Sequence, residues 1–136
     1  MIKIREKHHR LSLSHYLGLI RASFTICIRH RTPVFIEPNI VNQFTEILHI
    51  SCKTYFCSNW VYVFMPDHVH LAIEGTRECS NLWKAMVLFK QKTGYWFSKN
   101  MSKIHWQKDF YDHVHRNENE LINHILYITN NPVRKN

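Results

Sequence analysis

Two apolar runs joined by a short turn place the strongest constraint on how this chain can fold. Residues 60–64 (WVYVF) are rich in β-branched and aromatic side chains, and residues 68–74 alternate between polar and apolar ones. Residues 65–67 (MPD) read as the turn between them, and Gly75 ends the second run. We therefore predict a β-hairpin and place it at the centre of a sheet.

Alternation or helical spacing of apolar residues predicts the other elements. They are a strand over residues 23–28, a helix from 39 to about 52–55, a helix from 82 towards 96, a short strand around 110–114 and a last helix from 117 to 131. Asn117 and Glu120 would cap this last helix, and Pro132 would stop it. This order predicts an α+β, ferredoxin-like antiparallel sheet with helices on one face, plus a C-terminal helix.

Length and charge bound the class of protein. The 136 residues fit a single domain, which we predict to span 1–136 with residues 1–18 as a basic N-terminal arm. Lys and Arg number 18 against 10 acidic residues, a net charge of +8. Such an excess favours a polyanionic partner, because each neutralised phosphate releases counterions. Solubility alone is an equally good explanation of the charge by itself.

The four cysteines and the apolar runs bear on the compartment. No C-x-x-C pair is present, which argues against a zinc ribbon or a redox motif. The N-terminal residues are charged and do not resemble a secretory signal. The apolar runs are far shorter than the roughly 20 residues of a membrane span. We expect a cytoplasmic protein with reduced thiols and no membrane association.

The sequence DHVH at residues 67–70 carries the clearest chemical signal. Side chains alternate along a strand, so His68 and His70 share one face while Val69 and Leu71 point into the helices. Two imidazoles on an open sheet face form a two-point metal platform, although a bare H-x-H is more often plain surface. Residues 112–115 repeat DHVH and remain an alternative pair. We favour the first pair because it lies in a central apolar strand, and expect the second near DNA or solvent.

A second signal lies on the last predicted helix. Tyr127 and Asn131 are four residues apart and therefore share a helix face. A phenol beside a metal-bound phosphate is a plausible nucleophile, and Asn131 offers an oxygen to the metal. The commoner fate of a tyrosine in an amphipathic helix is to be half-buried packing.

Several segments in one order resemble a known family. Residues 65–70 (MPDHVH) are similar to the metal-binding segment of single-tyrosine HUH transposases. Residues 89–96 (FKQKTGYW), 106–113 (WQKDFYDH) and 127–134 (YITNNPVR) look like the branch called REP-associated tyrosine transposases, as does the opening at 10–18. The resemblance covers nearly the whole chain, and four ordered segments are far more specific than H-x-H alone.

The resemblance implies definite roles. His68 and His70, with Asn131 at a position where relatives often carry Gln, would bind a divalent cation, Mg²⁺ or Mn²⁺. Tyr127 would attack a phosphate of single-stranded DNA flanked by hairpin or REP-like sequences, leaving a 5′-phosphotyrosine. The protein would act as a monomer or a homodimer. Basic side chains expected to hold phosphates, for which a solvated charge is the default reading, are Arg10, Lys90, Lys92, Lys108 and Arg116.

Two other functions remain open. A non-catalytic or decayed nucleic-acid-binding protein could use the same fold, but RNA-recognition domains place aromatic residues on the central strands, where this chain has His68 and His70. A metal hydrolase with activated water would need both histidines but not Tyr127. Only the transferase stays covalently bonded to its DNA.

Overall fold

The computed structural model describes residues 13–115, 119, 120 and 122–127. Residues 119, 120 and 122–127 are helical. The strands and helices follow one another along the chain in the predicted order. The capping pair predicted for the last helix lies partly outside the described residues, since these do not include Asn117. In chain order the other elements are η2 (Leu13–Tyr16), β1 (Arg21–Cys27), η3 (Arg29–Arg31), α1 (Pro38–Thr54), β2 (Cys57–Met65), β3 (His68–Gly75), α2 (Leu82–Asn100) and β4 (Tyr111–His115).

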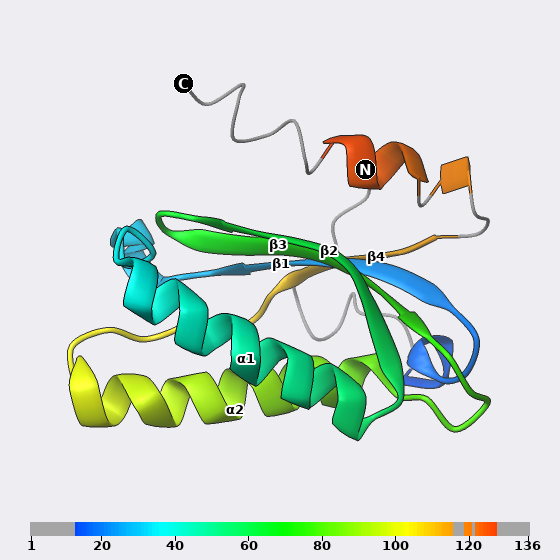
Figure 1. Ribbon diagram of the computed structural model, residues 1–136, viewed down its shortest axis with the longest axis horizontal. Helices are drawn as coiled ribbons and strands as arrows, with labels where there is room; N and C mark the ends of the chain where they lie inside the picture. Colours follow the sequence, from blue (N-terminus) through cyan, green and yellow to red (C-terminus); the bar gives the residue numbers. More distant parts are fainter. Residues whose placement is uncertain (1–12, 116–118, 121, 128–136) are drawn as a thin grey trace.

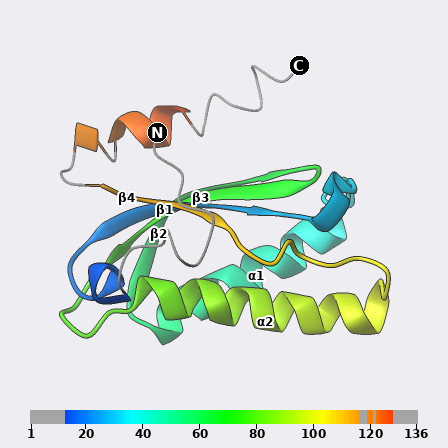
Figure 2. The ribbon, with the colours of Figure 1, turned by 180° about the vertical axis from the view of Figure 1, so that it is seen from behind.

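The four strands form one antiparallel sheet in the order β2-β3-β1-β4. α1 and α2 pack on one face, and the helical residues after β4 lie over the other (Figures 1 and 2). This is the predicted ferredoxin-like α+β fold. We call the face away from α1 and α2 the open face.

The predicted hairpin of β2 and β3 is confirmed, but its place in the sheet was only half right. β3 is central, whereas β2 is an edge strand. The reason is the crossover through α1. It makes β1 and β2 parallel to each other and leaves a gap between them, and β3 fills this gap by pairing with both.

Alternation along the strands separates the core from the open face. Alternate side chains of β1 and β3 are fully or almost fully buried against the helices. The residues between them face the other way. The core residues of this layer are Phe24, Ile26, Val69, Leu71 and Ile73 on the strands, with Phe44 and Leu48 of α1 and Met86 and Phe89 of α2.

The predicted N-terminal arm, residues 1–18, overlaps the described residues only from Leu13 onwards. There Tyr16 is fully buried, its hydroxyl donates to Asp112 of β4, and its ring lies 5.3 Å from that of Trp83. Nearby, a Cβ added at Gly75 would lie 1.8 Å from the carbonyl oxygen of Gly18, so β3 can end here only with glycine. The part of the chain after η2 is therefore packed onto the sheet.

None of the described helices combines the length and the apolar character of a membrane span.

Candidate active site

The two histidines of the first DHVH segment converge on the open face. His68 and His70 stand opposite Cys27 and Thr25 of β1 and opposite Met65 and Val63 of β2. Their Nε2 atoms lie 3.1 Å apart, with the ring planes nearly perpendicular. The shared face predicted from alternation is therefore present, and the two rings also point at one another.

The outer nitrogens of both rings are held by neighbours. His68 Nδ1 lies 2.5 Å from Asp67 Oδ1, and His70 Nδ1 lies 2.9 Å from Thr25 Oγ1. With Nδ1–H donating in both rings, the two Nε2 lone pairs face each other. Two imidazole nitrogens that bind one cation at about 2.1 Å and at right angles stand about 3.0 Å apart. The donor set and its spacing thus fit a divalent cation, and the outer bonds are those that orient metal-binding histidines.

Asp67 is in turn held by a residue that the sequence did not single out. Arg31 Nε donates to Asp67 Oδ2 at 2.8 Å, and Arg31 Nη2 lies 3.4 Å from His68 Nδ1. Burial alone would raise the pKa of Asp67, but hydrogen bonds from Arg31 and His68 outweigh it and lower the pKa. Asp67 is therefore a carboxylate that favours Nδ1–H on His68. A pocket opens beside this group, lined by Arg31, Pro33, Met65, Pro66, Asp67 and His68.

The predicted nucleophile lies on the helical residues that cover the open face. Ile125 packs against Ala72, two residues after His70 on the same face of β3. Tyr127 is 46% exposed and its ring stacks on His124, with centroids 5.9 Å apart and planes 17° from parallel. The structure thus brings the helix that carries Tyr127 over the strand that carries both histidines. Asn131, predicted to complete the metal site, lies outside the described residues.

Of the basic residues predicted to hold phosphates, the three that the structure describes do not gather at this site. Lys90 Nζ donates to the carbonyl oxygens of Gln107 and Lys108, at 2.8 and 3.0 Å, so it braces the segment before β4. Lys92 and Lys108 are exposed, and Lys92 belongs to α2 on the other side of the sheet. Arg10 and Arg116 lie outside the described residues.

The second DHVH segment lies within β4, and its surroundings differ from those we expected. His113 and His115 share the open face with the first pair, but His115 is only 5% exposed. The expectation that this segment lies near solvent is wrong for His115, whereas proximity to DNA stays a prediction. The reason is that β4 pairs with β1, and the helical residues 119, 120 and 122–127 bring Glu120 and His124 against the histidines.

The open face of the two central strands bears no aromatic residue apart from histidine. β1 presents Ser23, Thr25 and Cys27 there, and β3 presents His68, His70 and Ala72. The bases that an RNA-recognition sheet stacks would find no ring of Phe or Tyr on these strands. The arrangement favours metal chemistry over base stacking.

Three comparisons place this chain among known proteins. The profile of a family described as "Transposase IS200 like" matches residues 17–131, most of the chain. A protein of Haemophilus influenzae that carries the name of a REP-associated tyrosine transposase is 28% identical over 122 residues, which are 82% of this chain and 69% of the relative.

A solved structure of a REP-associated tyrosine transposase bound to a REP hairpin is similar in fold. It superposes with a TM-score of 0.71 at 19% sequence identity, over 93% of this chain and 72% of the other. At this identity the likeness speaks for the fold, and it agrees with the ferredoxin-like sheet described above.

Proposed function

Because this chain belongs to the IS200-like transposase family, we propose that it cuts and rejoins single-stranded DNA through a phosphotyrosine at Tyr127. A divalent cation held by His68 and His70 would assist the reaction. The observation that carries the proposal is the pair of facing Nε2 atoms, 3.1 Å apart, whose outer nitrogens are held by Asp67 and Thr25.

The chemistry assigned to each residue is simple. The Tyr127 oxygen attacks the scissile phosphorus, the bond from phosphorus to the 3′-oxygen breaks, and the phenol proton ends on the released 3′-hydroxyl. The DNA is left joined through its 5′-phosphate to Tyr127. The freed 3′-hydroxyl, or that of another strand, reverses the step without ATP, because the phosphotyrosine conserves the energy of the phosphodiester.

The cation would supply Lewis-acid stabilisation of charge on the phosphate. His68 and His70 would bind it as neutral imidazoles, and Asp67 and Thr25 would keep their Nε2 atoms directed at it. Imidazole suits Mn²⁺ better than Mg²⁺, and an oxygen from Asn131 would suit either. Arg31, at the rim of the pocket beside His68, offers a guanidinium to a phosphate of the bound strand.

The proposed substrate is a hairpin in single-stranded DNA. Its support is the similar fold of a transposase solved with a REP hairpin, together with the net charge of +8. Exposed Lys92 and Lys108 would contact phosphates on the helix side of the molecule, and we propose the same for Arg10 and Arg116. Location in the cytoplasm, and action as a monomer or a homodimer, remain predictions.

A covalent-adduct gel tests the proposal. A labelled single-stranded oligonucleotide, with a hairpin and flanks taken from DNA beside the gene, is incubated with Mn²⁺ and protein and then run under denaturing conditions. We expect a shifted band with the natural protein and none with Tyr127→Phe. Tyr95→Phe is the matched control, because Tyr95 is also an exposed helical tyrosine but lies on α2.

Three results would contradict the proposal. An adduct that persists in Tyr127→Phe would assign the nucleophile elsewhere. Cleavage without any adduct would indicate a hydrolase that uses water. Tight binding of the hairpin with neither cleavage nor adduct, at saturating Mn²⁺, would indicate a non-catalytic DNA-binding protein.

A further inference from the structure

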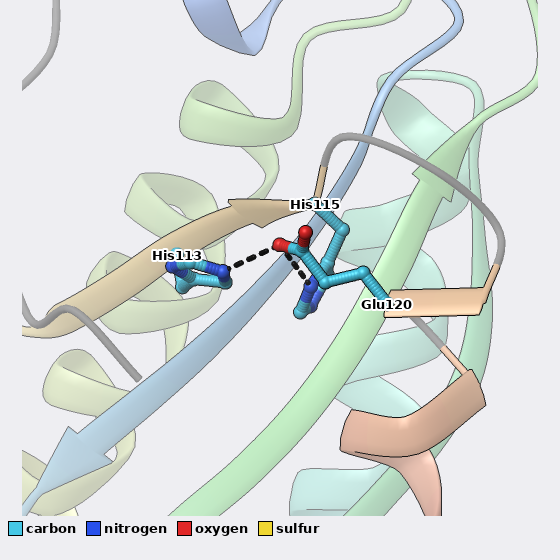
Figure 3. Close-up of side chains that lie close together, drawn as sticks. All are labelled: His113, His115 and Glu120. Carbon is cyan, nitrogen blue, oxygen red and sulfur yellow. Dashed lines mark hydrogen bonds and ion pairs between the residues drawn. The ribbon is translucent and has the colours of Figure 1, made fainter.

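A second group of possible metal ligands lies on the open face, one strand beyond β1 (Figure 3). His113 Nε2 lies 2.7 Å from Glu120 Oε1, and His115 Nδ1 lies 3.4 Å from the same oxygen. One ligand atom from each of the three residues falls within 4.8 Å of the other two. Figure 3 shows both rings of β4 directed at the carboxylate of Glu120.

One atom of this group is buried without a hydrogen bond. His115 Nδ1 has no partner in hydrogen-bond geometry, although the side chain of His115 is only 1% exposed. The other nitrogen, Nε2, lies 2.6 Å from Ser23 Oγ, which lies 2.5 Å from His124 Nδ1. In the tautomer whose Nε2–H donates to Ser23, Nδ1 carries a lone pair that faces a carboxylate oxygen. A metal ion between these two acceptors would replace their repulsion by two bonds.

We propose that His113, His115 and Glu120 form a second cation site, specific for a divalent transition metal such as Zn²⁺. Two imidazoles and one carboxylate are a common zinc ligand set, whereas Mg²⁺ and Ca²⁺ prefer oxygen ligands alone. Ligand atoms around a tetrahedral Zn²⁺ stand about 3.4 Å apart, so small side-chain rotations adjust the observed spacings. Ser23 holds the outer nitrogen of His115, as a second neighbour does at metal-binding histidines.

The site would act as a clamp. His113 and His115 belong to β4, whereas Glu120 belongs to the helical residues that carry Tyr127. A metal ion bound to all three ligands would fasten the helical residues 119, 120 and 122–127 to β4. His124, which stacks on Tyr127, also reaches the sheet through Ser23. The proposal goes beyond the proposed function, because it concerns how this helix is held rather than how DNA is cut.

Zinc binding in a variant without the first pair tests the site by itself. His70→Ala breaks the first pair, and Zn²⁺ affinity is measured by competition with a chelating dye. We expect one Zn²⁺ per chain. Loss of an outer-shell partner alone costs about 10- to 100-fold in metal affinity, so adding Glu120→Gln is expected to cost at least about 100-fold.

The control variant is His70→Ala with Glu46→Gln, since Glu46 is an exposed carboxylate on α1. It is expected to bind Zn²⁺ as tightly as His70→Ala. Glutamine keeps the size of Glu120 and still accepts from His113, and circular dichroism verifies that each variant is folded. The proposal is overturned if His70→Ala binds no Zn²⁺, or if Glu120→Gln and Glu46→Gln have the same affinity.

Hydrogen exchange measured by mass spectrometry tests the clamp. In His70→Ala, Zn²⁺ is expected to slow amide exchange over residues 119–127 at least tenfold, because the helix is tied at Glu120. With Glu120→Gln added, the metal is expected to leave this exchange unchanged. Zinc that binds at the site without slowing the exchange would refute the clamp. Neither measurement uses DNA, so both outcomes are independent of the proposed transposase activity.

Discussion

The tetrapeptide DHVH occurs twice in this chain, and its two copies build different surroundings from the same four residues. Asp67 lies in the turn before β3, where it holds His68 Nδ1 and accepts from Arg31. Asp112 lies inside β4, where alternation turns it to the helix side, and it is buried against the hydroxyl of Tyr16. β3 begins after the aspartate of its tetrapeptide, whereas β4 begins before it. This difference decides whether the aspartate contacts the histidine next to it or is buried in the core.

The imidazoles differ in a corresponding way. In the first copy the Nε2 atoms face each other, and both outer nitrogens are held. In the second copy the rings face Glu120 and lie against His124, while a pocket opens beside His68 of the first. The first copy thus borders a pocket, whereas the second lies against the helical residues that carry Tyr127; we propose the first for DNA cleavage and the second for attachment of this helix.

The largest expected difference between the copies is in DNA cleavage. His70→Ala removes one of two converging nitrogens and is expected to lower the single-turnover rate by about 10³-fold, since metal stabilisation is worth several kcal/mol. His113→Ala is expected to lower this rate by no more than about tenfold, because it only weakens the attachment of the helix that carries Tyr127. Rates are measured on a labelled hairpin oligonucleotide with Mn²⁺. A larger loss in His113→Ala would reverse the assignment.

The two aspartates offer a sharper test, because they differ only in their place relative to the strand. Asp67→Asn is expected to raise the Mn²⁺ concentration for half-maximal cleavage by about 10- to 100-fold, with recovery at saturating Mn²⁺. Asp112→Asn is expected to leave this concentration unchanged. It should instead lower the free energy of unfolding by ~1–3 kcal/mol, because it weakens the buried bond to Tyr16. Thermal or urea unfolding measures the second effect, and equal Mn²⁺ requirements would contradict the contrast.

The smallest expected effect concerns the pKa of His124, whose ring lies against the second DHVH segment, in the metal-free protein. Burial, with the nearby His115 and His113, lowers the pKa of His124 to about 4. The released helix would bind a proton near the ordinary pKa of about 6.5. Docking is therefore strongest above pH 6.5 and weakens as pH falls towards 4, since only the released form takes up the proton. An NMR titration of the His124 ring measures this, and a midpoint near 6.5 would show that the ring is solvated.

Local pattern was enough to predict most of the fold. Alternation in residues 68–74 predicted β3 and the shared face of His68 and His70, because the period of a strand is two. Helical spacing predicted α1 and α2. The edge position of β2 was not predictable in this way, since it depends on which strand fills the gap left by the α1 crossover.

Local sequence pattern did not predict the hydrogen-bond partners of the histidines. Thr25 and His70 are 45 residues apart in sequence, and Ser23 and His124 are 101 apart. Such contacts follow from strand register and helix docking, which no short window of sequence encodes. Arg31 was missed for the same reason, as it is 36 residues from Asp67. The role proposed for Tyr127 rests on its spacing from Asn131 and, more specifically, on family resemblance, because a helical tyrosine alone is usually packing.

Anomalous diffraction from crystals grown with Mn²⁺ tests the central claim most directly. The account predicts a peak between the Nε2 atoms of His68 and His70, lost in His70→Ala and retained in His113→Ala. A peak at His113, His115 and Glu120 with none between His68 and His70 would contradict it, because the second DHVH segment would then hold the Mn²⁺ that we assign to the first.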